Sequence, residues 1–325
     1  MSVELVAVDV GGTHARFARA RVTAAGAVEI DEPATLHTRD HASFQTAWED
    51  FQQMQGGKLP AAVAIAAAGP VGGEMIRFTN NPWVIRPALI PEKLGAARYT
   101  VINDFGAVGH AVACAGDEHF VHLTGPDQPL PASGTISIVG PGTGLGVAHI
   151  WRDGKAGYRV QATEGGHIDF APLDTIEDAI LARLRQRYRR VSAERVVSGP
   201  GLVDIYEALA AMEGRAIQAL DDRTLWSLGT SGEDSLAAAA VDRFCLSLGS
   251  FAGDVALAQG ASGVVIAGGL GLRIKDTLLQ SGFANRFIAK GRYEEMMSGL
   301  PVKLITHPQP GLFGAVLAFV REHLK

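Results

Sequence analysis

The sequence predicts an α/β protein with two domains. Short apolar runs, typical of buried strands, alternate with stretches in which apolar residues recur every three or four positions, as in helices packed on a sheet. A chain of 325 residues is also longer than one hydrophobic core usually supports. We therefore expect strand–helix units that form sheets in two separate cores.

Composition favours a soluble cytoplasmic protein. Hydrophobic residues make up 47% of the chain and charged residues 19%, and the net charge of −5 gives no general attraction to nucleic acid or to anionic membranes. No apolar run approaches the ~20 residues that cross a bilayer, and the first residues lack the pattern of a signal peptide. Cys114 and Cys245 fall in apolar helical patterns, so we expect two buried thiols in a reducing compartment.

The first third of the chain alternates strands with helices. Its apolar first strand turns at a glycine pair and returns as a hairpin, and two more apolar runs predict buried strands. Strands are predicted at residues 3–10, 15–21, 62–67 and 99–102, and helices at 43–55 and from 103 to 114.

The rest of the chain starts a second unit of the same kind. A loop rich in Gly, Pro and Asp at 116–134 marks the boundary. Residues 6–18 and 137–148 share an apolar strand, a Gly-Thr turn and a second apolar strand, which indicates a short internal repeat. Further strands are predicted at 135–140, 264–267 and 302–306, and helices at 175–190, 235–259, 273–281 and 312–324. The final strand and helix, 302–306 and 312–324, are expected to pack back on the first domain.

Two glycine-rich turns are the most informative motifs. The first ends a buried strand with Val8-Asp9-Val10-Gly11-Gly12-Thr13, and the second is Gly140-Pro141-Gly142-Thr143-Gly144-Leu145-Gly146. Glycine leaves backbone N–H groups open to a phosphate, and Asp9 could hold a hydrated cation beside it. The second turn matches neither the dinucleotide fingerprint nor the Walker pattern. Together the two turns predict that both close on one polyphosphate ligand. The alternative is that both are plain structural turns.

Asn103-Asp104 lies where a predicted strand gives way to a helix, the end of a strand at which α/β proteins collect ligands. A carboxylate there could accept a proton from a hydroxyl nucleophile during phosphoryl transfer. The alternative is that Asp104 is only the N-cap of the helix, a position that Asp fills well.

Three further segments carry candidate binding residues. Glu164-Gly165-Gly166-His167 suits hydrogen bonding to sugar hydroxyls; an exposed loop or a metal site, which lacks a third ligand nearby, are the alternatives. Glu194 lies near a predicted helix start, where the helix dipole alone favours an acid. Gly268-Gly269 follows a buried strand and could lie against a nucleotide base, or could serve only close helix–strand packing.

The only basic cluster lies on the predicted helix 175–190. It is interpreted as a solvated cationic face, with polyphosphate or nucleic-acid contact as the alternative. Its members are Arg183, Arg185, Arg187, Arg189 and Arg190.

Taken in order, these blocks closely resemble the bacterial glucokinases. The Glu-Gly-Gly-His and Ser-Ala-Glu-Arg blocks are the most specific, and the resemblance runs from about residue 5 to Pro310-Gly311-Leu312. The blocks are 9–13, Thr79-Asn80 with Trp83, 102–105, 142–148, 164–172, 192–202 and 266–269.

That resemblance implies an actin-like ATPase (ribonuclease H-like) fold with a central cleft. It implies a small α/β domain of residues 1–112 plus 307–325 and a large one of residues 113–306. The expected activity is ATP-dependent phosphorylation of glucose at O6, the first step of glycolysis, with Mg²⁺ and in a homodimer. A non-catalytic sugar sensor on the same fold, another phosphoryl donor or another hexose remain as alternatives.

The same resemblance implies a role for each matching residue. Asp104 is the expected catalytic base, and no residue is assigned as a direct metal ligand because Mg²⁺ is expected to be held mostly through water near Asp9. The family usually has Asn where this chain has His14, whose role stays open. The expected glucose contacts are Asn103, Asp104, Glu164, His167 and Glu194, and the expected nucleotide contacts are Val8, Asp9, Val10, Gly11, Gly12, Thr13, Gly142, Thr143, Gly144, Gly268 and Gly269.

Overall fold

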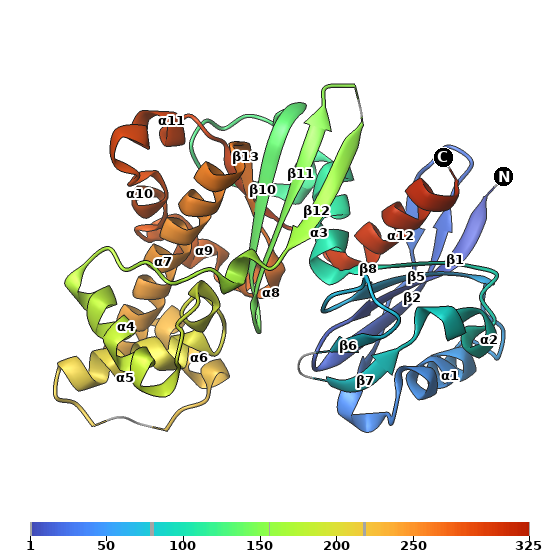
Figure 1. Ribbon diagram of the computed structural model, residues 1–325, viewed down its shortest axis with the longest axis horizontal. Helices are drawn as coiled ribbons and strands as arrows, with labels where there is room; N and C mark the ends of the chain where they lie inside the picture. The colour runs from blue at the N-terminus through green and yellow to red at the C-terminus, as the bar shows by residue number, and fades with distance from the viewer. Residues whose placement is uncertain (1, 79–80, 156, 217–218, 325) are drawn as a thin grey trace. The chain divides into compact units, whose positions relative to one another are not determined.

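The computed structural model describes residues 2–78, 81–155, 157–216 and 219–324. It divides the chain into two compact units, unit 1 with residues 1–115 and 307–325 and unit 2 with residues 116–306. Each unit is built around one main sheet flanked by helices (Figure 1).

Unit 1 contains a mixed sheet in the order β3-β2-β1-β5-β8, with β4 also paired to β2. β1 and β2 form the predicted antiparallel hairpin, and β5 and β8 continue the sheet in parallel with β1. A separate two-stranded ribbon is formed by β6 and β7. The strands are β1 (Val3–Val10), β2 (His14–Val22), β3 (Val28–Ile30), β4 (Ala34–His37), β5 (Ala62–Ala67), β6 (Ile76–Phe78), β7 (Asn81–Ile85) and β8 (Arg98–Asn103).

Different helices cover the two faces of this sheet, because alternate residues of a strand point to opposite sides. Val6 and Val8 belong to a core shared with α1 (Phe44–Met54), whose start is fixed by a capping box between Ser43 and Thr46. Leu5 and Ala7 belong to a second core shared with α12 (Pro310–His323). α12 lies beside α3 (Asp104–Cys114), and α2 (Ile90–Leu94) completes the unit (Figure 1).

Unit 2 contains a six-stranded sheet in the order β12-β11-β10-β13-β14-β9. β10 pairs antiparallel with β11 and parallel with β13, which in turn is parallel to β14. The strands are β9 (Phe120–Thr124), β10 (Ser133–Pro141), β11 (Leu145–Asp153), β12 (Tyr158–Thr163), β13 (Ala261–Ile266) and β14 (Val302–Ile305).

The helices of unit 2 pack around the long helix α7 (Ser235–Gln259), which carries much of the core. By length and composition α7 could cross a membrane, contrary to the expectation from the sequence, but 72% of its most apolar window is buried within the structure. A buried core helix passes the same test. The other helices are α4 (Thr175–Arg187), α5 (Gly201–Met212), α6 (Asp222–Ser231), α8 (Gly268–Arg273), α9 (Lys275–Gln280), α10 (Phe283–Ile288) and α11 (Glu294–Ser298).

The two main sheets repeat one topology. In each, a hairpin and a third antiparallel strand are followed on the other side by two parallel strands, so β3-β2-β1-β5-β8 corresponds to β12-β11-β10-β13-β14. The shared order supports the internal repeat that the sequence indicates over residues 6–18 and 137–148.

Several local predictions were wrong. The expected boundary loop at 116–134 contains the edge strand β9, and the strand expected at 302–306 is β14, which lies in the sheet of unit 2 and not on the first domain. The helix expected at 273–281 is present as α9, but the short helix α8 before it, which begins at Gly268, was not predicted. Cys245 is buried as expected, but Cys114 is exposed because it lies at the C-terminal end of α3.

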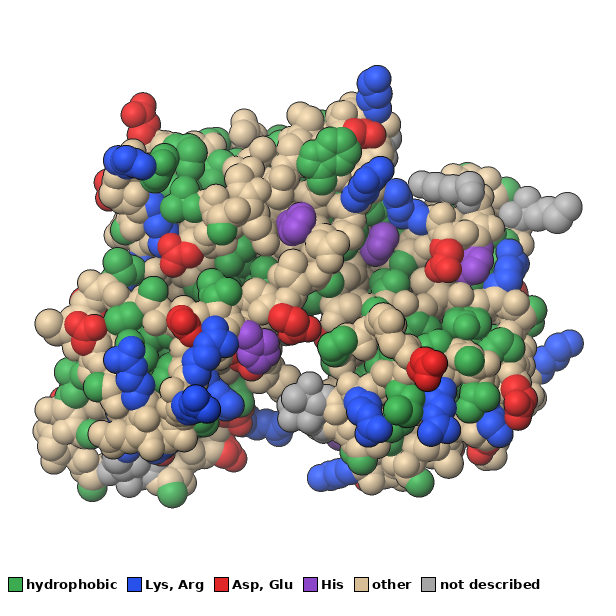
Figure 2. All heavy atoms as spheres, in the orientation of Figure 1, with side chains coloured by type: hydrophobic (Ala, Val, Ile, Leu, Met, Phe, Trp, Pro, Cys, Tyr) green, Lys and Arg blue, Asp and Glu red, His purple; other side chains and the backbone are tan. Residues whose placement is uncertain are grey.

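The arginine cluster forms more ion pairs than the predicted solvated cationic face would. Arg183 and Arg187 form ion pairs with Glu207 on α5, and Arg190 pairs with Asp169. On the face drawn in Figure 2, the Lys and Arg side chains of the described residues are interspersed with Asp and Glu.

Candidate active site

The turn between β1 and β2 is fixed by hydrogen bonds that its backbone carbonyl groups accept. The side chain of Thr38 donates to the carbonyl oxygen of Gly12 at 2.9 Å, and its backbone N–H donates to that of Thr13 at 3.0 Å. The amide of Asn81 reaches the carbonyl oxygen of Gly11 at 3.4 Å. In a trans peptide the next N–H points opposite to the carbonyl, so the N–H groups of residues 12 and 13 face away from Thr38 and Asn81. Such a turn can receive an anion.

Asp9 lies half-buried near the end of β1, just before this turn. Its Oδ2 is 3.4 Å from the guanidinium of Arg16, and a Cβ atom added to Gly311 would lie 2.7 Å from the same oxygen. The carboxylate therefore packs on the first turn of α12. Burial raises the pKa of Asp9, an effect that the charge of Arg16 opposes.

The ends of β1, β5 and β8 bring the first turn and Asn103-Asp104 to one edge of the sheet. The parallel register sets Val10 opposite Ala67, and Ala67 opposite Asn103. With neighbouring strands about 4.8 Å apart, Asn103 lies about 10 Å from Val10 along this row. The expected base and the expected phosphate turn of unit 1 therefore share a single edge.

Asn103, not Asp104, is the N-cap of α3, so the alternative reading of Asp104 as the cap was wrong. The Asn103 Oδ1 accepts the N–H groups of Phe105 and Gly106 at 2.9 and 3.0 Å, and its amide nitrogen donates to the carbonyl oxygen of Gly69 at 3.2 Å. Asp104 is the first residue of the helix, half-buried, and its Oδ1 also accepts the N–H of Phe105. A helix N-terminus is a favourable place for a negative charge.

In unit 2, the turn between β10 and β11 is fixed by backbone hydrogen bonds. The N–H of Gly142 donates to the carbonyl oxygen of Gly144 at 2.8 Å, and the N–H of Gly199 donates to that of Gly142 at 2.7 Å. Thr143 is exposed at the tip of the turn.

Two adjoining segments carry the expected sugar residues of unit 2. Glu164 precedes a 3₁₀ turn (Gly165–His167), and Glu194 lies within another (Ala193–Arg195). The Nε2 atom of His167 is 4.0 Å from Oε1 of Glu194. The segments are joined at an antiparallel bridge between Asp169 and Ser192.

These segments also pack directly on the β10–β11 turn. The N–H of Leu145 donates to Oε2 of Glu194 at 2.9 Å, and a Cβ atom at Gly144 would lie 2.6 Å from that oxygen. A Cβ atom at Gly166 would lie 2.0 Å from the Leu145 carbonyl oxygen. The sequence predicts sugar and phosphate residues separately, and within unit 2 they form one cluster.

Gly268 and Gly269 begin α8 beside the end of β10. Gly268 has a φ of +82°, and a Cβ atom there would lie 2.6 Å from the carbonyl oxygen of Pro141, so close packing accounts for this glycine. A Cβ atom at Gly269 would meet nothing within 4 Å. Open space beside exposed backbone is what the expected adenosine contact requires.

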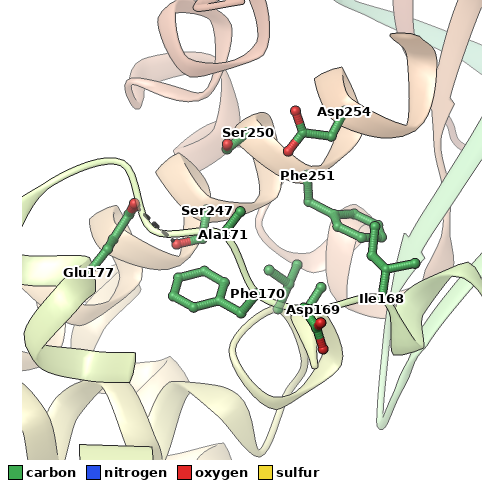
Figure 3. Close-up of a pocket in the computed structure, with 11 residues that line it drawn as sticks. Ile168, Asp169, Phe170, Ala171, Glu177, Ser247, Ser250, Phe251 and Asp254 are labelled. Atoms are coloured by element: carbon green, nitrogen blue, oxygen red, sulfur yellow. Dashed lines mark hydrogen bonds between the residues drawn. The ribbon is translucent and has the colours of Figure 1, made fainter. Parts of the chain in front are cut away.

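A small pocket of about 20 Å³ lies behind the segment that follows His167 (Figure 3). One wall is formed by residues 168–171, and the opposite wall includes Ser247, Ser250 and Phe251 on α7. The Asp254 carboxylate at its rim pairs with Lys290.

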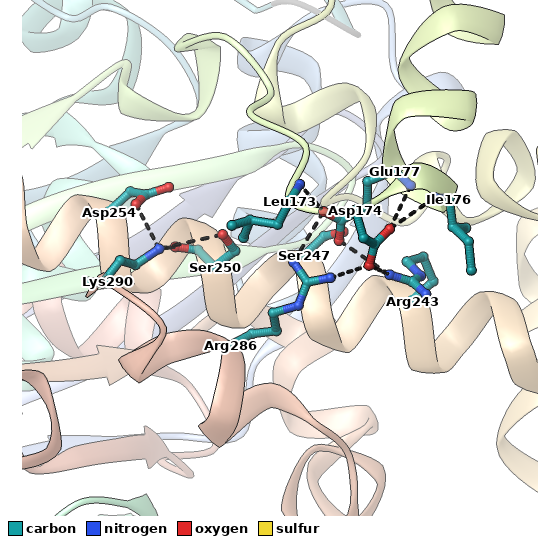
Figure 4. A network of polar contacts seen from close by, with 10 residues as sticks. All are labelled: Leu173, Asp174, Ile176, Glu177, Arg243, Ser247, Ser250, Asp254, Arg286 and Lys290. Atoms are coloured by element: carbon teal, nitrogen blue, oxygen red, sulfur yellow. Dashed lines mark hydrogen bonds and ion pairs between the residues drawn. The ribbon is translucent and has the colours of Figure 1, made fainter. Parts of the chain in front are cut away.

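An ionic network fixes the next part of this segment to α7 and α10 (Figure 4). Asp174 caps α4 and pairs with Arg243 and Arg286. The carboxylate of Glu177, 1% exposed, pairs with both arginines and accepts the N–H of Leu173 at 2.7 Å. Partial burial opposes the negative charge of Asp174, but the N–H of Glu177 and the two arginines outweigh it and hold the pKa of Asp174 below its usual value.

Sequence reasoning missed this network and the residues behind the first turn. Asp174 followed by Glu177 at the start of an apolar helix pattern was an available capping signal. Thr38 and Asn81 carried no signal, because their role depends on contacts across the fold. Residues 79–80, which are part of the resemblance, lie outside the described residues. Among the described residues, no group of three or more His, Cys, Asp or Glu side chains could hold a metal ion.

Comparison with known proteins gives consistent matches over the whole chain. The family model "Glucokinase" matches residues 5–322. A glucokinase from Zymomonas mobilis is 58% identical over 321 residues, which cover 99% of both chains, and one from Caulobacter vibrioides is 38% identical over 326 residues, covering 97% of this chain and 94% of that one. The crystal structure of a glucokinase from an Antarctic psychrotroph is 33% identical, covers 98% of this chain and 99% of its own, and superposes with a TM-score of 0.83. The predicted class, a two-domain α/β sugar-kinase fold of the actin-like type, is confirmed.

Proposed function

Because the chain belongs to the glucokinase family, we propose that it transfers the γ-phosphoryl group of ATP to O6 of glucose, the first step of glycolysis. The observation that carries the proposal is the row Val10–Ala67–Asn103, which sets a carboxylate and a phosphate turn on one sheet edge. The products are glucose 6-phosphate and ADP.

Asp104 is the proposed base. Its carboxylate takes the proton of the 6-hydroxyl as O6 forms a bond to the γ-phosphorus, and the bond from that phosphorus to the bridging oxygen breaks to release ADP. The Asn103 cap and the Phe105 N–H hold this residue at the start of α3, which limits the motion of the carboxylate.

Glucose is held by Asn103, Glu164, His167 and Glu194 in this proposal. The oxygen of Asn103 is occupied by the helix cap and one amide N–H by Gly69, so its contribution is the second amide N–H. The carboxylates accept hydrogen bonds from sugar hydroxyls, and His167 contributes a ring nitrogen beside Glu194.

The nucleotide is proposed to lie against the backbone of three turns, which are Gly11–Thr13 after Val8, Asp9 and Val10, the Gly142-Thr143-Gly144 turn, and Gly268-Gly269. The N–H groups of residues 12 and 13 suit phosphate oxygens.

The surroundings of Asp9 fit a Mg²⁺ ion. Mg²⁺ prefers oxygen ligands and usually keeps several waters beside one carboxylate and substrate phosphates, and Asp9 offers a half-buried carboxylate next to the phosphate turn. When bound, the ion would offset charge on the phosphates. A nearby cation also favours the charged form of Asp9, which burial disfavours.

We further propose a cytoplasmic homodimer. Two cysteines are too few for a disulfide framework, and the reaction consumes intracellular ATP. The dimer rests on membership of the family alone. Sedimentation of the purified protein tests it.

A coupled assay tests the reaction. Formation of phosphorylated sugar is measured with ATP, ADP or polyphosphate as donor and glucose, mannose or fructose as acceptor. We expect the highest kcat/KM for ATP with glucose. A higher value for ADP or polyphosphate, or for fructose, would overturn the assignment of donor or acceptor.

A further inference from the structure

One carboxylate of unit 2 touches both the sugar segments and the nucleotide turn. Oε2 of Glu194 accepts the N–H of Leu145 at 2.9 Å, at the end of the Gly142–Gly144 turn, while Oε1 faces His167 at 4.0 Å. The side chain of Glu194 is 28% exposed, so it is not closed off from a ligand.

The β10–β11 turn packs closely against this carboxylate. A methyl group at Gly144 would meet Oε2 at 2.6 Å, whereas one at Gly142, two residues earlier in the same turn, would meet nothing within 4 Å. The approach of Gly166 to the Leu145 carbonyl oxygen brings the sugar segment against the same residue.

We infer that Glu194 is a positioning residue that couples glucose binding to nucleotide binding, through its hydrogen bond to the N–H of Leu145. The inference rests on the proposed function, because it assumes that Glu194 binds the sugar and that the Gly142–Gly144 turn binds phosphate.

The physical basis is that the two oxygens of a carboxylate move together. A sugar hydroxyl on Oε1 fixes the rotamer of Glu194, and this holds Oε2 on Leu145 and orders the turn before the nucleotide arrives. The nucleotide then binds to a turn whose conformational freedom is already reduced. By thermodynamic reciprocity, the nucleotide must increase glucose affinity by the same factor.

The quantity to measure is a ratio, the glucose Kd without nucleotide divided by the Kd with saturating AMPPNP, both from calorimetry. A direct loss of affinity for one ligand cancels in this ratio. We expect a ratio of about ten for the unaltered protein. In Gly144→Ala the added methyl group displaces Glu194 from Leu145, and the ratio should fall at least threefold.

Gly299→Ala is the control, because it adds the same methyl group elsewhere in unit 2, where the nearest atom would lie 3.4 Å away in ordinary contact, and its ratio should stay within about twofold of the unaltered protein. Glu194→Gln should weaken glucose binding but keep the ratio of the two Kd values, since an amide oxygen still accepts the Leu145 N–H. Glu194→Ala should weaken glucose binding and also lower the ratio.

An unchanged ratio in both Gly144→Ala and Glu194→Ala, or a ratio of one in the unaltered protein, would overturn the coupling. Failure of the proposed function looks different, because the unaltered protein would then bind no glucose and form no glucose 6-phosphate.

Discussion

At the scale of single residues, the reaction depends most on Asp104. Asp104→Asn keeps the shape and the hydrogen bond to the Phe105 N–H but cannot take a proton. We expect kcat to fall by about 10²–10⁴ while the glucose Kd changes only a few-fold. The coupled assay and calorimetry measure the two quantities, and Asp117→Asn, at an exposed acid, is the control. A near-normal kcat in Asp104→Asn would remove the base assignment.

His110, on α3, should make stability depend on pH. Burial, together with the charge of Arg321, lowers the pKa of this imidazole to about 4, while the unfolded chain has a value near 6.5. The folded state therefore binds fewer protons than the unfolded state between these values. The stabilisation is complete above about pH 6.5 and is lost progressively as pH falls towards 4, by on the order of 2–3 kcal/mol.

Urea unfolding at pH 7, 6 and 5 checks this expectation. His110→Gln removes the titrating group, so the free energy of unfolding should fall less steeply with decreasing pH in this variant than in the unaltered protein. Equal slopes, or an imidazole that titrates near 6.5 by NMR in the folded state, would contradict it.

Residue types predicted the local structure around the candidate site well where a strand ends in a distinctive motif. The run from Val8 to Thr13 predicts both the strand and the turn, because apolar burial and glycine geometry are local properties. The choice of Asn103 over Asp104 as the helix cap could not be made from sequence, since both side chains cap well and only the backbone path decides. The bond between Glu194 and Leu145 joins residues 49 positions apart, and no local pattern predicts it.

At the scale of elements, the contact between α3 and α12 should be intolerant of any side chain at Gly314. A Cβ atom there would lie 1.7 Å from the carbonyl oxygen of Ala107, so the helices must separate to admit it. We expect Gly314→Ala to lower the free energy of unfolding by about 1–3 kcal/mol despite the better helix propensity of Ala. Because α3 carries Asp104 at its first position, kcat should fall as well.

Gly72→Ala provides the comparison for this change. A Cβ atom at Gly72 would meet nothing within 4 Å, so its urea midpoint should stay close to that of the unaltered protein. Equal midpoints for the two variants would mean that the helices are not in tight contact.

Elements with one strongly apolar face were predictable, and half-buried ones were not. α1 and β5 are fully specified by periodic or continuous burial. Every residue of β9 is only partly buried, so this edge strand lacks the alternation that identifies a strand, and its sequence predicts a loop. The break between α8 and α9 depends on Ile274, whose backbone leaves the helical region without any Gly or Pro as a signal.

At the scale of the whole molecule, the chain enters unit 1 twice and unit 2 once. The core of unit 2 is formed entirely by residues between 121 and 304, whereas one of the two cores of unit 1 needs the C-terminal helix. α12 contributes Leu312, Val316 and Phe319 against β1 and β5, all fully buried. Unit 1 is therefore completed only when the end of the chain has been made.

This connectivity predicts opposite behaviour of two fragments. Residues 116–306 should fold alone and unfold cooperatively in urea, because no buried side chain of their core is missing. Residues 1–115 should remain unfolded or aggregate, since the apolar face of the sheet under α12 would be exposed.

Joining residues 307–325 to residue 115 through a flexible Gly-Ser linker should restore a cooperative transition, because linkage only has to bring α12 back to that face. Circular dichroism and limited proteolysis measure the folding of all three fragments. A cooperative transition in 1–115 without α12 would mean that this face of the sheet does not need the helix, and that the two passes of the chain through unit 1 are independent in folding.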